Sequence, residues 1–163
     1  MDIDKNITLL SSDKEKIEIS FKAVQRSVLV KWILEDYPDD EVVSLNYIRS
    51  DILKKIKEYL IHYENEDPKE IERPLPSHNF KECVDEWDYN FINVDLKLIF
   101  EIILGANYMD IKPLIELGSA KIASIIKGNT TEEINKIFVL NNNFTPEEEQ
   151  QILEEKNWCM ENL

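Results

Sequence analysis

The sequence ITLLSSDKEKIEISF, residues 7–21, decides the fold class of this chain. Two short apolar runs, 7–10 and 17–21, flank the polar turn 11–14, and the second run alternates apolar and polar residues. Alternation with a period of two is typical of a half-buried strand, so this stretch predicts an antiparallel hairpin. A brief third strand is predicted at 42–45. Together with helical stretches elsewhere in the chain, these strands predict an α/β (α+β) fold with a small N-terminal sheet.

Helical periodicity dominates the sequence that follows the hairpin. A short helix is predicted at 23–34, and apolar residues three and four positions apart predict a longer helix at 47–63. Two further apolar stripes predict helices at 96–105 and 111–126, each ended by a glycine. The stretch 64–86, which follows the helix predicted at 47–63, lacks this periodicity and holds three prolines among charged residues, which predicts a mobile loop.

Residues 128–163 are predicted to form a helical extension that follows an α/β domain at 1–127. Thr130 and Glu133 have the spacing of a capping box, and Thr145 followed by Pro146 repeats the signal of a helix start. The apolar side chains of this extension either fold back on the preceding helix or present an apolar surface to a partner.

The composition limits the classes of partner. The chain has 163 residues with 33 acidic and 19 basic side chains, which gives a formal net charge of −14. Phosphate backbones and anionic lipid attract clustered basic residues, so we expect neither nucleic-acid nor membrane binding. The first residues lack a basic and apolar leader, and no apolar run is long enough to span a membrane. We expect a protein of a reducing compartment, the cytoplasm or the nucleus.

Residues that could carry chemistry are sparse. His62 and His78 are the only histidines, and neither lies near a serine or cysteine in a nucleophile motif. Cys83 and Cys159 stand 76 positions apart without metal-ligand spacing, and the three glycines form no phosphate-binding loop. We therefore expect no catalytic residue, metal or cofactor, and a binding or scaffolding role instead of an enzyme.

Several blocks of sequence carry a resemblance to a known family, and their order and spacing agree from residue 7 to residue 159. They are DILKKI (51–56), WDYNF (87–91), LIFEIILGANYMDI (98–111), IKGNTTEEI (126–134), NFTPEEE (143–149) and NWC (157–159). With these blocks the chain resembles the S-phase kinase-associated adaptor family, whose members join cullins to F-box proteins in SCF ubiquitin ligases. The resemblance implies a BTB/POZ-like unit followed by C-terminal helices that bind the F-box.

The function that the resemblance implies is a non-catalytic adaptor of a cullin-RING (SCF) E3 ubiquitin ligase, which bridges the cullin and F-box substrate receptors for protein degradation. An alternative is a family paralogue that binds F-box proteins outside cullin complexes, for example in a kinetochore-type assembly. Loss of the Asn-Tyr pair would favour that alternative, and the pair is present as Asn107 and Tyr108. An unrelated small enzyme is the third hypothesis. In the absence of an F-box partner, we also expect a homodimer through the C-terminal helices, because their apolar surface would otherwise be exposed to water.

The resemblance also implies roles for individual residues. Asn107 and Tyr108 are implied to face the cullin, with a half-buried helix-end aromatic as the alternative for Tyr108. Pro146 matches a proline that is hydroxylated and glycosylated in some protist members, and its alternative role is simply to start a helix. For the F-box side, the matched blocks and the helical faces together give eight residues, some of which could be core: Ile115, Ile122, Ile126, Ile137, Phe138, Ile152, Trp158 and Cys159.

Overall fold

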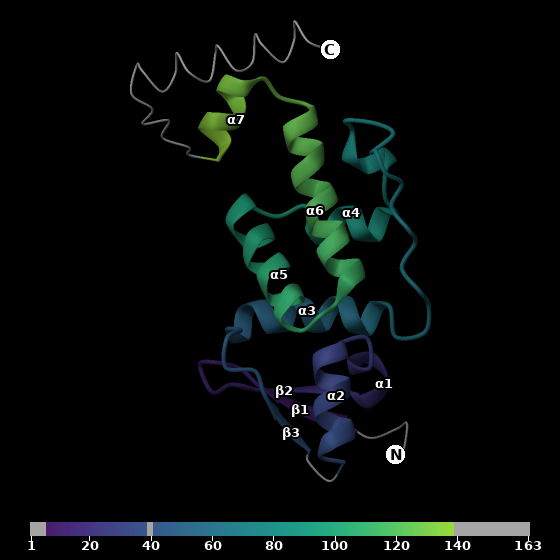
Figure 1. The fold of residues 1–163 in the computed structure, drawn as a ribbon, viewed down its shortest axis with the longest axis vertical. Coiled ribbons are helices and arrows are strands. Elements are labelled where there is room, and N and C mark those ends of the chain that lie inside the picture. The colour runs from purple at the N-terminus through teal and green to yellow at the C-terminus, as the bar shows by residue number, and fades with distance from the viewer. Residues whose placement is uncertain (1–5, 39–40, 139–163) are drawn as a thin grey trace, which may run out of the picture. The chain divides into compact units, whose positions relative to one another are not determined.

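The computed structural model describes residues 6–38 and 41–138, shown as coloured ribbon in Figure 1. The chain divides into two units, 1–128 and 129–163, and each unit is described by itself. The first unit contains a small sheet and most of the helices, and the second contains one helix within the described residues.

The sheet of the first unit has three strands in the order β2-β1-β3. Strands β1 (Asn6–Leu10) and β2 (Lys16–Ser20) are antiparallel, with Ile7 opposite Ile19, so the predicted hairpin is confirmed. Strand β3 (Val42–Ser44) lies parallel to β1 on its other edge. The isoleucines of the pair are buried while the residues between them on β2 are exposed, as the alternating pattern requires. The α/β fold class is confirmed.

Two helices connect the hairpin to β3, where the sequence predicted one at 23–34. Helix α1 (Phe21–Val24) ends before Ser27, and α2 (Val28–Asp36) begins after it. The break has a physical cause, because the Ser27 hydroxyl caps α2 by accepting a hydrogen bond from the Val30 amide at 3.2 Å. The same hydroxyl donates to the Met109 carbonyl at 2.7 Å, which ties this turn to the far end of the unit's sequence.

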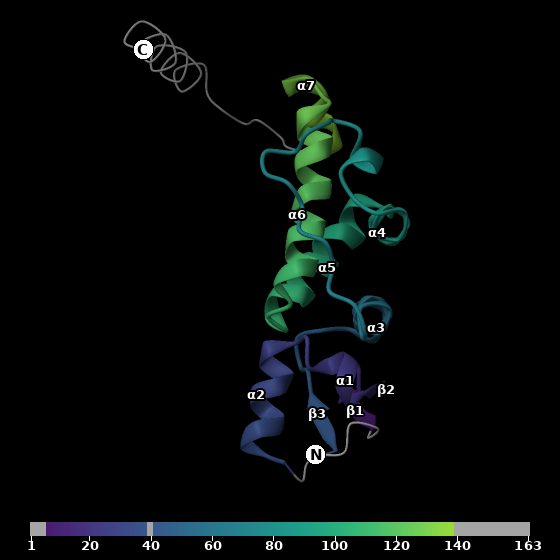
Figure 2. The same ribbon diagram turned by 90° about the vertical axis from the view of Figure 1, so that its right-hand side faces the viewer.

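Helix α3 (Ser50–His62) lies between the sheet and the later helices, as Figures 1 and 2 both show. It contacts β2 on one side and α5 (Leu96–Tyr108) on the other, and α5 packs in turn on α6 (Lys112–Lys127). The helices predicted from periodicity in these three regions are therefore present. Helix α3 supplies five fully or nearly fully buried apolar side chains to the core: Ile52, Leu53, Ile56, Tyr59 and Leu60.

The predicted end of α5 at Gly105 is wrong, because the helix continues to Tyr108. Gly105 allows a close approach to α3 instead, since a Cβ there would lie only 2.7 Å from Cδ1 of Ile56. The helix ends in a Schellman motif, in which the Asp110 amide donates to the Asn107 carbonyl at 3.1 Å. Asp110 adopts φ 49°, the left-handed conformation that glycine more often supplies at this position.

The segment predicted as a loop at 64–86 contains a single short turn, the 3-10 helix Phe80–Glu82, and ends at α4 (Glu86–Ile92). Phe80 is buried, and the ammonium of Lys121 lies 5.2 Å from the centre of its ring. The segment therefore packs on the helices of the first unit, and its mobility stays a prediction.

The second unit is described only as far as residue 138. Its helix α7 (Thr131–Ile137) begins with the predicted capping box, in which the Thr130 amide donates to the Glu133 carboxylate at 2.8 Å. The helix start predicted at Thr145 lies outside the described residues.

The hairpin turn caps helix α3, which gives a pH-dependent prediction. The Asp13 carboxylate accepts hydrogen bonds from the Ser50 amide at 2.9 Å and from the Ser50 hydroxyl at 2.6 Å. Hydrogen bonds from the side chains of Ser11 and Ser50 lower the pKa of Asp13 to about 2. Because the unfolded chain protonates first, this contribution is present above about pH 4 and is lost as the pH falls toward 2. Thermal unfolding of Asp13→Asn and wild type should therefore converge over that range, and a constant difference would contradict the cap.

Candidate functional site

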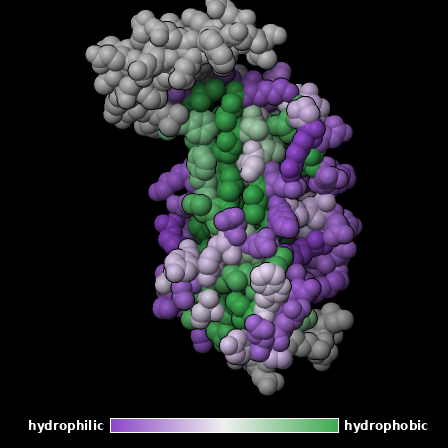
Figure 3. All heavy atoms as spheres, in the orientation of Figure 1, coloured by the Kyte–Doolittle hydropathy of each residue, from purple (hydrophilic) through white to green (hydrophobic). Residues whose placement is uncertain are grey.

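An exposed surface lies along helix α5 and the loop before α3. We call it the α5 surface and define it by five residues, Tyr47, Phe100, Leu104, Asn107 and Tyr108. Tyr47 is 83% exposed and Leu104 is 67% exposed, which is unusual for side chains of this size. Figure 3 shows that apolar side chains, in green, gather over α5 and α6 on this face. Exposed apolar groups clustered in this way are typical of protein-interaction surfaces.

The two tyrosines of the α5 surface contact each other. The rings of Tyr47 and Tyr108 meet edge to face, with their centroids 5.3 Å apart. Asn107 is exposed, and Tyr108 is half-buried against the core. A large ring held in this way loses little conformational freedom when a partner binds, and it presents a hydroxyl at its outer end.

The backbone beneath Asn107 and Tyr108 is held firmly. The Ile111 amide donates to the Ala106 carbonyl at 2.9 Å and completes the Schellman motif. Met109 is fully buried, and its carbonyl accepts the hydrogen bond of the Ser27 hydroxyl. The end of α5 is thus fixed by its own turn and by the start of α2, so both side chains project from a preorganised position.

Beside the tyrosines lies a cavity of about 300 Å³ with a charged rim. Arg49 bridges the start of α3 and the middle of α5, because its guanidinium contacts Asp51 at 2.7 Å and Glu101 at 3.1 Å. The hydrogen bond from Arg49 lowers the pKa of Asp51 below its usual value. These two ion contacts place one cation and two carboxylates, a net charge of −1, at the edge of an apolar surface.

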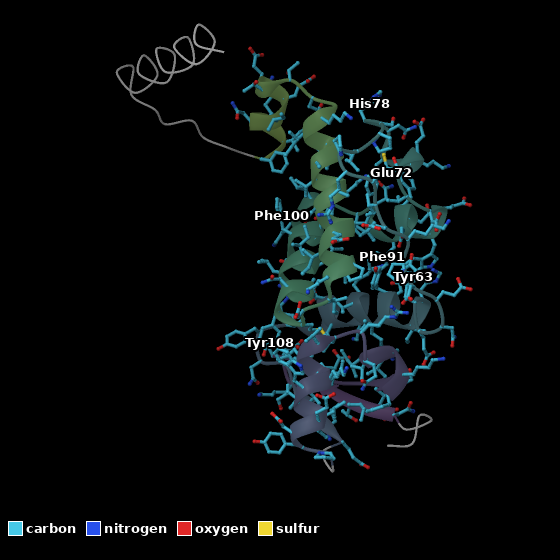
Figure 4. All side chains as sticks on the ribbon, turned by 45° about the vertical axis from the view of Figure 1, so that its right-hand side comes forward. Tyr63, Glu72, His78, Phe91, Phe100 and Tyr108 are labelled. Carbon is cyan, nitrogen blue, oxygen red and sulfur yellow. The ribbon has the colours of Figure 1, made fainter. Side chains whose placement is uncertain are left out.

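A second surface is a groove of about 720 Å³ between helix α6 and the preceding loop. We call residues 71–75 the strap and the cavity the strap groove. Figure 4 shows Glu72 of the strap on the opposite side of the unit from Phe100 and Tyr108 in that view. The lining of the groove is mostly apolar and includes Ile71, Pro74, Leu75, Ile115, Ala123 and Ile126.

Two polar contacts join the strap to α6. The guanidinium of Arg73 lies 2.7 Å from the Glu116 carboxylate, and the Lys127 ammonium donates to the Leu75 carbonyl at 2.6 Å. Both contacts are solvent-exposed, and exposed ion pairs contribute little energy individually. Together they define where the strap crosses the helix.

The residues predicted for the F-box side are distributed between the two units. Ile115 and Ile126 line the strap groove, and Ile126 is 47% exposed. Ile122 is half-buried and packs against the core instead of lining the groove. In the second unit, Ile137 is partly exposed on α7 and Phe138 follows at its end. Three predicted F-box residues and the modification position lie outside the described residues: Ile152, Trp158, Cys159 and Pro146.

The side chains that could bind a metal ion are dispersed in the described part of the chain. No three His, Cys, Asp or Glu side chains of these residues gather closely enough to hold a metal ion. His62 stacks on Trp87 with ring centroids 3.6 Å apart, an arrangement that supports the packing of α4 on α3. Within the same residues, no helix combines the length and apolar character needed to cross a membrane.

Asp88 is the one described carboxylate that is nearly fully buried, with 7% of its surface exposed. Its Oδ1 atom has no hydrogen-bond partner among the described residues, while the carboxyl group is hydrogen-bonded to Tyr63. Burial raises the pKa of Asp88 above its usual value, and burial with the Asp88 contact also raises that of Tyr63. Asp88 belongs to an aromatic cluster between α3 and α4, with Tyr59, Tyr63, Trp87 and Phe91.

Sequence reasoning missed two features of these surfaces. Tyr47 was assigned only to a helix start, and nothing in the sequence pairs it with Tyr108, 61 residues later. The strap lies in the stretch predicted as a mobile loop, because the prolines of that stretch interrupt helical periodicity and the strap's contacts with α6 are long-range. The apolar Ile71 and Leu75 among charged neighbours were the only local signal of packing.

The geometry defines an α/β unit with two exposed apolar surfaces, and comparisons with known proteins show its family. Residues 5–65 match the model of the Skp1 family tetramerisation domain, and residues 112–159 match that of the Skp1 family dimerisation domain. A Tetrahymena thermophila S-phase kinase-associated protein 1 homolog is 44% identical over 95% of this chain and 94% of its own. The E3 ubiquitin ligase complex SCF subunit sconC of Arthroderma otae is 42% identical over 94% of this chain and 93% of its own.

A second fungal protein, the sconC subunit of Talaromyces stipitatus, is 41% identical over 94% of this chain and 96% of its own. The chain therefore belongs to the Skp1 family. The expected BTB/POZ-like unit is confirmed, whereas the roles of individual site residues stay predictions.

The buried carboxyl group gives a second pH-dependent prediction. Because the folded chain binds the Asp88 proton more tightly than the unfolded chain, wild-type stability should fall as the pH rises from about 4 through the raised pKa. Asp88→Asn keeps an acceptor for Tyr63 and removes the charge. We expect the variant to gain stability relative to wild type as the pH rises. Chemical denaturation of both proteins at pH 4 and pH 7 measures this, and a variant that loses stability relative to wild type between the two pH values would contradict it.

Proposed function

We propose that this chain is a non-catalytic adaptor subunit of an SCF ubiquitin ligase, which holds a cullin and an F-box protein at the same time. Its relatives at 41–44% identity over nearly the whole chain include proteins named as SCF subunits. The observation that carries the proposal is the presence of two separate apolar surfaces on one unit, the α5 surface and the strap groove. An adaptor needs two such surfaces, because its partners must not compete.

The cullin is assigned to the α5 surface. Asn107 and Tyr108 project from a fixed helix end, and Tyr47 and Leu104 extend the exposed apolar area around them. Interfaces of this kind depend on a few rigid aromatic anchors surrounded by contacts that exclude water. Tyr108 meets this description, because its ring is already packed on Tyr47 and its position is set by the Schellman motif.

The F-box protein is assigned to the strap groove and to the apolar residues of the second unit. Ile115 and Ile126 offer an apolar lining that a partner would cover, and Ile137 adds partly exposed apolar surface on α7. We include Trp158 on the strength of the resemblance alone. Covering such groups on binding removes apolar area from water, which drives association.

The mechanism of the adaptor is geometric. A substrate receptor held on one surface and a cullin on the other raises the effective concentration of substrate near the rest of the ligase. This role requires no reacting group on the chain itself. The net charge of −14 opposes binding to nucleic acid or anionic membranes, and we propose that the protein works in the cytoplasm and nucleus.

The test is a pair of binding measurements that separate the two surfaces. Asn107→Ala/Tyr108→Ala should weaken binding to a purified cullin at least about tenfold and leave binding to an F-box protein unchanged. Trp158→Ala should do the reverse, at a cost of about 2–4 kcal/mol on the F-box side. Biolayer interferometry with the full chain measures both affinities.

Ile126→Asp and Ile61→Asp form a matched pair for the groove, because the two isoleucines are 47% and 45% exposed and only the first lines it. Only Ile126→Asp should lower the affinity for the F-box protein. F-box binding without any cullin binding by wild type would support the alternative of a paralogue that works outside cullin complexes. Binding of neither partner would contradict the adaptor function.

A further inference from the structure

The strap forms half of the groove that we assign to the F-box protein. We propose that the strap is a specificity-determining wall, so that an amphipathic helix of the F-box partner packs between the strap and α6 instead of on α6 alone. This inference rests on the proposed function of the groove. It assigns a binding role to a segment whose sequence predicted only a connecting loop.

The lining of the groove comes from both walls. Helix α6 contributes Ile115, Ala120, Ala123 and Ile126, and its small alanines leave open the space that the groove occupies. The strap contributes Ile71, Pro74 and Leu75 on the other side. An apolar segment placed in the groove would contact both walls, since no other element lines it among the described residues.

The strap is held at two points along α6. Glu116 lies in the second turn of the helix and Lys127 is its last residue, so the Cα atoms of these two residues are roughly 16 Å apart along the axis. Long side chains bridge this distance, with Arg73 reaching Glu116 and Lys127 reaching the Leu75 carbonyl. The wall is therefore placed by weak, exposed contacts, which allow it to adjust when a partner enters.

The chemistry of the groove indicates its occupant. Its floor is apolar, while its rim carries Glu72, Arg73, Glu116 and Lys127. A helix with one apolar stripe and mixed charges beside it matches this pattern, because the stripe fills the groove and the charges meet the rim. Side chains too large for the groove would displace the strap, and smaller ones would leave a void, so the strap selects among partners.

The experiment measures the affinities of purified F-box proteins and of a purified cullin for the wild-type chain and its variants. Leu75→Asp places a charge in the strap wall and leaves α6 unaltered. We expect this variant to bind the F-box protein at least about tenfold more weakly than wild type does. Its affinity for the cullin should stay within twofold of wild type, which would show that the unit remains folded. His78→Asp, an exposed change in the same loop outside the groove lining, should match wild type.

A charge exchange tests the contact that places the strap. Arg73→Glu and Glu116→Arg should each lower the affinity for the F-box protein about twofold to fivefold, and the combined exchange should restore most of that affinity. Leu75→Asp with wild-type F-box affinity would overturn the strap as a wall while the proposed function stands. Failure of wild type to bind any F-box protein would overturn both.

Discussion

The packing of helix α3 on two sides is the constraint on which the rest of the first unit depends. Its buried side chains face the sheet on one side and α5 on the other, and α5 approaches closely only because residue 105 is glycine. A helix buried in this way cannot shift without opening two interfaces at once. It follows that the end of α5, and Tyr108 on it, are fixed by the core.

This rigidity explains how a small chain can serve as an adaptor. The α5 surface depends on the Schellman motif and on the hydrogen bond between Ser27 and Met109, both of which tie it to the core. The strap groove is bounded by α6, which packs on α5. Two partners on these surfaces would therefore hold a defined geometry relative to each other, and association would cost little further ordering.

Local patterns predicted the fold well, because strand alternation and helical periodicity report burial directly. The hairpin, the helices near 50–62 and 112–127, and the capping box at Thr130 all follow from neighbours close in sequence. Apart from the helix break at Ser27, which a local cap causes, the main errors arose where a distant residue decides the structure. Gly105 was taken for a helix end, whereas it serves a contact with Ile56, and the end depends on Asp110. Tyr47 and the strap were missed for the same reason, since their partners lie 61 and more than 40 residues away.

Simultaneous binding tests the adaptor account most directly. Purified chain, cullin and F-box protein can be mixed in equal amounts and separated by size-exclusion chromatography with light scattering, and the affinity for each partner can be measured with the other at saturation. The account predicts one complex with the summed mass of the three proteins, and an F-box affinity unchanged by cullin within about twofold. Displacement of one partner by the other would show that the two surfaces overlap in function, and it would contradict the account.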